Sequence, residues 1–177
     1  MLQQISTCYI LQRVGYYLKQ NTIIDLTHQL RSLKKRVVLT HGTFDLFHVG
    51  HSYFLNRSKK EGDILIVGVD SDEKVGKIKG LQRPIIPQQH RIELLLNHKA
   101  VDFVFLIDKI NYDEEKYYLE MYEKLFPNIM TFGRNFEYRN QFFKKQYQIR
   151  GVKYKEINKI FKEAISASNI IKKIKES

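Results

Sequence analysis

Short runs of β-branched and apolar residues alternate along most of this chain with stretches whose apolar residues recur at helical spacing. The run at 64–69 is continuously apolar, as expected of a strand buried on both faces, whereas the run at 152–157 is more polar and favours a sheet edge. Alternating strands and helices form βαβ units with right-handed crossovers, which predicts an α/β fold with a parallel sheet. The expected strands are 36–41, 64–69, 101–107, 128–132 and 152–157, and the expected helices are 51–60, 87–98, 113–125, about 136–149 and one that starts near Ser166.

The chain has 177 residues, enough for one domain or one domain with a short extension. We interpret residues 1–34 as an N-terminal helical extension, with a helix over about 22–34, and residues 35–177 as the main domain. Residues 9–18 are too apolar to lie comfortably in water, so we expect them to pack on the domain or at a subunit interface.

Composition excludes several classes of protein. The single cysteine, Cys8, cannot form an intramolecular disulfide and favours a reducing compartment. No stretch is long and apolar enough for a membrane-spanning helix, and the first residues do not resemble a signal peptide, so we expect a soluble cytoplasmic protein.

The net charge is +11, of which residues 141–177 carry +7. Such a chain attracts polyanions, including nucleic acids and nucleoside triphosphates.

The segment Gly42-Thr43-Phe44-Asp45-Leu46-Phe47-His48-Val49-Gly50-His51 carries the strongest chemical signal. It follows an expected strand and opens an expected helix, whose free N–H groups and dipole favour an anion. His48 and His51 are three residues apart, so both imidazoles lie on one face of the first turn and can donate to phosphate oxygens. A zinc site is disfavoured because the chain has neither a cysteine pair nor an HExxH motif to supply further ligands.

This segment matches the signature G-x-F-D-x-x-H-x-G-H and resembles the cytidylyltransferase-like nucleotidyltransferase superfamily. The resemblance implies a Rossmann-like fold, with a five-stranded parallel sheet and helices on both faces, and makes 35–177 a nucleotidyltransferase domain. It implies that His48 and His51 stabilise the α-phosphate. Asp45 belongs to the signature, but we expect it to shape the turn rather than act as a base.

Two further segments resemble the same superfamily. The first is Lys79-Gly80-Leu81-Gln82-Arg83-Pro84, followed by Arg91, in which Lys79 would reach the triphosphate from an exposed, mobile position and Arg91 would contact phosphate from another. The second is Ile165-Ser166-Ala167-Ser168-Asn169-Ile170 at the start of the last helix, where hydroxyls and free N–H groups would hold the β- and γ-phosphates. This chain has Ala167 where the family usually has Thr. Ser166 could also serve only as an ordinary N-cap of the helix.

The resemblance assigns roles to a larger set of residues. The expected catalytic residues are His48, His51, Lys79 and Arg91; the expected nucleotide-binding residues are Gly42, Thr43, Phe44, Gly50, Gly133, Arg134, Asn135, Ser166 and Ser168; the expected second-substrate residues are Asp72 and Arg83; no protein ligand is assigned to a metal.

The motif spacing resembles ADP-heptose-forming adenylyltransferases most closely, which implies transfer of AMP from ATP to a sugar phosphate such as heptose 1-phosphate. Thr43, however, matches the motif of the cytidylyltransferase branch. The alternative is therefore a CTP-dependent enzyme that acts on glycerol phosphate or on another polyol or amino-alcohol phosphate. The expected cofactor is Mg²⁺, the expected partners are an NTP and a small phosphorylated substrate, and relatives suggest a homodimer. A nucleic-acid-binding or regulatory protein on an inactive scaffold is the rival of a different class; intact His48 and His51 argue against it.

Overall fold

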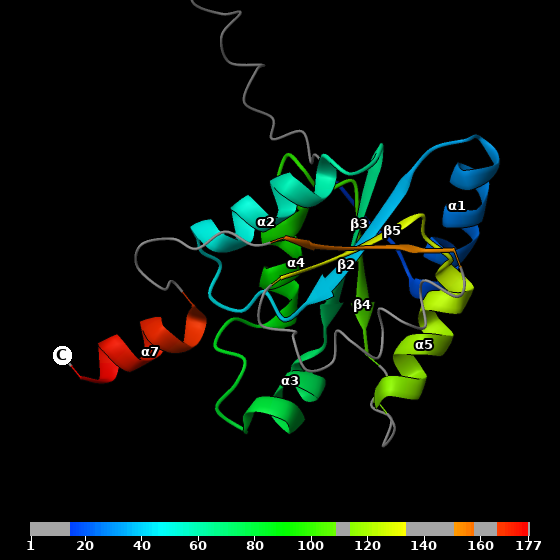
Figure 1. Cartoon of the computed structure of the whole chain (residues 1–177). Helices are drawn as coiled ribbons and strands as arrows, with labels where there is room; N and C mark the ends of the chain where they lie inside the picture. Colours follow the sequence, from blue (N-terminus) through cyan, green and yellow to red (C-terminus); the bar gives the residue numbers. More distant parts are fainter. Residues whose placement is uncertain (1–14, 109–113, 134–150, 158–165, 177) are drawn as a thin grey trace, which may run out of the picture.

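The computed structural model describes residues 15–108, 114–133, 151–157 and 166–176. Its strands form one sheet in the order β1-β4-β3-β2-β5-β6, and every neighbouring pair is parallel (Figure 1). The strands are β1 (Tyr16–Tyr17), β2 (Val37–Gly42), β3 (Ile64–Asp70), β4 (Phe103–Ile107), β5 (Ile129–Gly133) and β6 (Lys153–Ile157). The predicted α/β fold with a parallel sheet is confirmed, but the sheet has six strands rather than five because the short β1 was not anticipated.

The helices fall close to the predicted positions, except for α3 (Asp72–Lys79), which was not among the expected helices. They are α1 (Gln20–Ser32), α2 (Val49–Lys59), α3 (Asp72–Lys79), α4 (Gln88–Leu96), α5 (Glu114–Leu125) and α7 (Ala167–Lys175). The helix expected at about 136–149 lies outside the described residues. Among the residues that the structure describes, no helix has the length and apolar character needed to cross a membrane.

Two apolar cores lie on opposite faces of the sheet. Alternate residues of β2 point to opposite faces, so Val37 and Leu39 join a core with α1 and α5, whereas Val38 joins a core with Leu55 of α2 and Leu95 of α4. Figure 1 shows these helix pairs on the two sides of the sheet. Burial on both faces explains why β3 is a continuous apolar run.

The N-terminal segment contributes to the same architecture. Tyr16 of β1 pairs with Phe103 of β4, and the fully buried Ile23 of α1 joins the core formed with α5. The helix expected over 22–34 is confirmed with its bounds shifted by two residues. The described part of the expected extension is therefore built into the same sheet and core as the strands that follow it.

The topology determines where a ligand can bind. β3 and β4 lie on one side of β2, whereas β5 and β6 lie on the other. Open parallel sheets bind ligands beyond the carboxyl ends of the strands, where the strand order reverses. The loop that leaves β2 at Gly42 therefore occupies the position expected of a site.

Candidate active site

The two motif histidines form the beginning of α2. His48 is the N-cap residue, and its Nδ1 accepts a hydrogen bond from the Gly50 backbone N–H at 3.1 Å. The backbone N–H of His48 donates in turn to Nδ1 of His51 at 3.4 Å. The two imidazole rings stack with centroids 3.9 Å apart. The sequence pattern H-x-G-H thus builds a reciprocal capping box out of imidazoles.

This capping box determines the protonation of both rings. A backbone N–H can only donate, so each Nδ1 is an acceptor and each neutral imidazole carries its proton on Nε2. Burial lowers the pKa of His48, and burial together with His48 and Lys79 lowers the pKa of His51 to about 4. Both rings are therefore neutral near pH 7, and both keep an Nε2–H donor that the cap does not use.

Apolar side chains hold His51 in this geometry. The rings of Phe44 and Phe47 lie 5.4 and 5.5 Å from the His51 ring, centroid to centroid. Phe44 has a φ of 50° and is buried, and a Cβ at Gly42 would meet its ring at 3.3 Å. The absence of a side chain at Gly42 thus makes room for Phe44. The ring of Phe44 therefore supports His51, and the role in nucleotide binding that the resemblance implies for Phe44 stays a prediction.

Asp45 ties the motif loop to the second predicted segment. Its Oδ1 accepts hydrogen bonds from the backbone N–H groups of Ile85 and Ile86, both at 2.8 Å, and its Oδ2 pairs with Arg83 Nη2 at 2.7 Å. The carboxylate is almost completely buried. This geometry agrees with a turn-shaping role for Asp45 and commits Arg83 to an internal ion pair.

Arg91 corrects the sequence-based expectation. It was expected to be exposed and mobile, but its exposed fraction is 0%. The guanidinium donates to the backbone carbonyl oxygens of Thr43, Ile86 and Asp70, and it pairs with Asp72 Oδ1 at 2.7 Å. It is buried because α4 turns this position toward the loops that leave β2 and β3. Arg91 therefore holds those loops together.

Lys79 is exposed, as predicted, at the last position of α3. Its Nζ donates to Thr43 Oγ1 at 3.1 Å, which places the ammonium against the motif loop. Partial burial and the neighbouring Arg83 lower its pKa, while Asp70 and Asp45 oppose that shift. The structure thus brings together His48, His51, Thr43 and Lys79.

The two expected second-substrate residues line one pocket of about 460 Å³. Asp72 is already engaged with Arg91 and with the backbone N–H of Gln88, and Arg83 is engaged with Asp45. The remaining lining residues are Glu73, Gly76, Lys77, Leu81, Pro84 and Pro87. The pocket is therefore bounded by α3 and the loop that Asp45 anchors.

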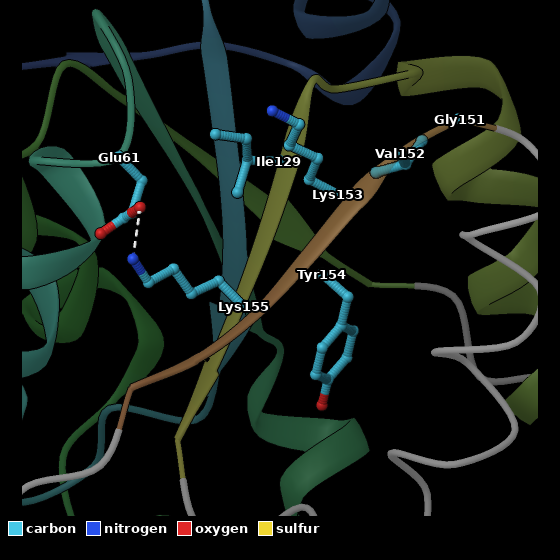
Figure 2. A pocket seen from close by; sticks show the side chains of 7 residues that line it. All are labelled: Glu61, Ile129, Gly151, Val152, Lys153, Tyr154 and Lys155. Atoms are coloured by element: carbon cyan, nitrogen blue, oxygen red, sulfur yellow. Dashed lines mark hydrogen bonds and ion pairs between the residues drawn. The ribbon is translucent and has the colours of Figure 1, made fainter.

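A second pocket, of about 520 Å³, lies away from the motif (Figure 2). It is lined by Glu61, Ile129, Gly151, Val152, Lys153, Tyr154 and Lys155. Lys155 points toward Glu61 and pairs with it at 2.8 Å, whereas Tyr154 points away. Ile129 and Lys153 begin β5 and β6, so this pocket lies at the amino ends of the strands, where parallel sheets rarely bind substrates.

The remaining expected nucleotide-binding residues lie toward the C-terminus. Gly133 ends β5, while Arg134 and Asn135 lie outside the described residues. Ser166 caps α7, as predicted, and its Oγ accepts from the Asn169 backbone N–H at 3.1 Å. None of the residues Ala167–Lys175, all of them described, is buried, and Figure 1 shows α7 outside the layers of the domain. The Ser166 carbonyl oxygen also accepts from the Ile170 backbone N–H of the same helix.

Three site residues were not singled out from the sequence, namely Asp70, Lys74 and Tyr118. Asp70 ends β3, and its buried carboxylate lies next to Thr43, Lys74 and Tyr118. The position of an acid directly after a buried strand was a usable signal for Asp70. Tyr118 comes from α5, which is far away in the sequence, and no pattern pointed to it.

The carboxylates near the motif do not form a ready metal site. Asp45, Asp70 and Asp72 each accept from or pair with a cationic side chain. Within the described ranges, no group of three or more His, Cys, Asp or Glu side chains is arranged to hold a metal ion. These residues do not fit a resident Mg²⁺ site.

Comparison with known proteins identifies the relatives of this site. The sequence profile described as Cytidylyltransferase-like matches residues 39–173, which includes the strand before the motif and almost all of α7. The chain belongs to the cytidylyltransferase-like family. It is a nucleotidyltransferase. The matched range includes the segment from Gly42 to His51, on which the sequence analysis based the resemblance to this family.

The curated relatives are longer proteins. "Bifunctional protein HldE" of Desulfatibacillum aliphaticivorans is 36% identical over 71% of this chain and 25% of its own length, and that of Wolinella succinogenes is 34% identical over 90% and 31%. This nucleotidyltransferase therefore spans about a quarter to a third of the curated relatives that it matches. These matches confirm the relationship to the heptose-adenylyltransferase branch.

Solved structures support the same fold. A lipopolysaccharide core biosynthesis protein from Thermoplasma volcanium is 29% identical, with a TM-score of 0.56, over 72% of this chain and 99% of its own. Pantoate-beta-alanine ligase from Francisella tularensis has a TM-score of 0.66 over 89% of this chain and 73% of its own, at 14% identity. The second likeness concerns the Rossmann-like fold alone.

Proposed function

We propose that this nucleotidyltransferase moves NMP from an NTP, with ATP favoured, to the phosphate of a sugar phosphate such as heptose 1-phosphate. The observation that carries the proposal is the pair of neutral imidazoles at the beginning of α2, both with Nε2–H donors. The HldE relatives support a sugar phosphate as acceptor.

The reaction needs positioning and charge stabilisation more than a strong base. An acceptor phosphate oxygen attacks the α-phosphorus in line and forms a new P–O bond, while the bond from the α-phosphorus to its bridging oxygen breaks. The electron pair of that bond leaves with pyrophosphate. Negative charge grows on the α-phosphoryl oxygens, where the His48 and His51 Nε2–H groups and the amino end of α2 donate. Lys79, at the end of α3, would approach the leaving phosphates.

Neutral donors suit this step. Burial lowers the pKa of both imidazoles, which favours their neutral forms, and a neutral imidazole keeps its Nε2–H and can donate it to a phosphate oxygen. Mg²⁺ would enter with the triphosphate and neutralise part of its charge. The pocket bounded by Asp72 and Arg83 lies beside the loop that Asp45 anchors, and we assign it to the phosphorylated acceptor.

A CTP-dependent cytidylyltransferase is the alternative, supported by Thr43 in the motif. The choice of base depends on residues around Arg134 and Asn135, which lie outside the described ranges. Binding of nucleic acid by an inactive scaffold is disfavoured, because such a scaffold needs neither the imidazole capping box nor Lys79 beside it. We further infer that the enzyme acts in the cytoplasm, where NTPs are available, and homodimer formation stays a prediction that a mass measurement in solution tests.

The decisive experiment is pyrophosphate release from each of four NTPs, with heptose 1-phosphate, other sugar phosphates and glycerol phosphate as acceptors. Release with ATP and a sugar 1-phosphate supports the proposal. Release only with CTP and a polyol or amino-alcohol phosphate establishes the alternative. No release with any pair, together with salt-sensitive RNA binding, overturns both.

A further inference from the structure

We propose that Asp70 is a positioning residue that holds Lys79 over the triphosphate through the hydroxyl of Thr43. This inference deepens the proposed function and rests on it for the identity of the ligand. It starts from a chain of polar contacts that runs from the interior of the domain to the exposed end of α3.

The outer half of the chain connects two loops. Lys79 Nζ donates to Thr43 Oγ1 at 3.1 Å, and Thr43 Oγ1 donates to Asp70 Oδ2 at 3.4 Å. A hydroxyl has one proton to donate and lone pairs to accept with, so it can serve both partners at once. An acceptor that already donates to a carboxylate is a stronger partner for an ammonium.

The inner half fixes the carboxylate. Tyr118 donates from its hydroxyl to Asp70 Oδ1 at 3.1 Å and accepts from Lys74 Nζ at 2.6 Å. Lys74 Nζ also lies 3.6 Å from Oδ1 and 4.0 Å from the centroid of the Tyr118 ring. Both side chains are buried, so they hold Oδ1 in one place and turn Oδ2 toward the motif loop.

Arg91 constrains the backbone at Thr43 and at Asp70. Arg91 donates to the carbonyl oxygens of Thr43 and Asp70, which fixes the two residues of the bridge relative to each other. Lys79 is the exposed member, and it stands on a long side chain that could point elsewhere. The bridge keeps its ammonium against the motif loop before a nucleotide arrives, which reduces the ordering cost of binding.

Binding of ATP and of CTP by isothermal titration calorimetry tests this inference without an acceptor. Thr43→Val keeps the shape of the side chain and removes the hydroxyl, and Asp70→Asn removes the charge. Each should weaken NTP binding on the order of tenfold, as for the loss of a hydrogen bond to a charged group. Lys35→Ala removes an exposed lysine just before β2, at the end of that strand opposite the motif loop, and it should leave the affinity unchanged.

The Lys79→Ala background separates positioning from a general effect. If Thr43 and Asp70 act through Lys79, neither substitution should weaken binding further once Lys79 is alanine. A loss of the same size in both backgrounds overturns the inference. Asp70→Asn leaves Lys74 buried beside a neutral partner, so Asp70→Asn combined with Lys74→Met supplies a second variant without an uncompensated charge, and it should show the same dependence on Lys79.

Two further measurements complete the test. The loss caused by Asp70→Asn should be equal with and without Mg²⁺, and a loss confined to Mg²⁺-containing buffer would show that Asp70 binds metal instead. If the wild-type chain binds NTP but transfers NMP to no acceptor, the proposed function fails. The role of Asp70 is still decided in that case, by whether the effect of Asp70→Asn on NTP binding requires Lys79. Absence of NTP binding by the wild-type chain overturns both.

Discussion

Two helix N-termini in this domain carry the segments that we propose bind phosphate, and they differ in how they are held. At α2, His48 and His51 cap each other, Phe44 packs against His51, and Asp45 ties the loop to its neighbour. At α7, Ser166 makes the expected cap, but no residue of the helix is buried. Capping chemistry is local in both cases, whereas only α2 is fixed by the core. The difference teaches that a phosphate-binding motif is preorganised by what packs behind it.

The largest expected effect comes from the loops around α2, which the buried side chain of Arg91 holds together. Arg91→Ala removes a fully buried guanidinium and leaves Asp72 and three carbonyl oxygens without that partner. Because the carboxylate of Asp72 is partly exposed, most of the cost comes from the carbonyl oxygens; each buried acceptor left without a partner costs about 1–3 kcal/mol, which makes the total roughly 3 kcal/mol or more. We expect a loss of that size in the free energy of unfolding, measured with urea.

Lys79→Ala is the matched control for Arg91. It removes a cation from an exposed position, so its free energy of unfolding should stay within about 0.5 kcal/mol of the wild type while NTP binding weakens. An Arg91→Ala variant with wild-type stability would show that the guanidinium does not hold the loops.

The motif histidines should give the next largest effect, this time on the rate. His48→Ala and His51→Ala remove donors to oxygens whose charge grows in the transition state. Each should lower kcat by roughly 10²–10³, or about 2.7–4 kcal/mol, with a smaller change in KM. The double variant should lose less than the product of the single effects, because both donors act on one phosphoryl group. A destabilised variant with full activity per folded molecule would contradict the catalytic assignment.

The depressed pKa of His51 predicts a pH dependence of stability. The unfolded chain takes up a proton on this histidine near pH 6.5, whereas the folded chain does so near pH 4, because of burial, His48 and Lys79. The unfolded state binds more protons between these values, so stability should fall as the pH drops from about 6.5 to 4. The total loss from this group is on the order of 3 kcal/mol. His51→Gln should flatten that part of the curve, and an unchanged curve would show that His51 is not buried as a neutral ring.

The smallest expected effect lies at α7. Ser166→Ala removes an exposed cap and should cost about 1 kcal/mol locally. If Ser166 also binds phosphate, the KM for NTP should rise in the same variant, and Ala167→Thr should lower it by supplying another hydroxyl. A helix that is only capped by Ser166 predicts an unchanged KM in both variants.

The sequence by itself determined the alternation of strands and helices, the edge position of β6, the beginning of α2 at His48 and the cap at Ser166. These features depend on periodicity and on contacts between residues a few positions apart, which a sequence displays directly. The motif also carried the resemblance to the nucleotidyltransferase superfamily, and its spacing indicated that both imidazoles lie on one turn.

Only the tertiary structure decided the roles of Arg91, Asp70 and Tyr118. Arg91 looks like a surface arginine in the sequence, yet its partners come from the ends of β2 and β3 and from α3, and they exist only when the sheet brings those ends together. Tyr118 reaches Asp70 across 48 positions of sequence. Contacts at such separations depend on strand order and helix packing, so no local pattern reports them. The incorporation of β1 into the sheet has the same cause, because two residues without a strong strand pattern become a strand when β4 offers them an edge.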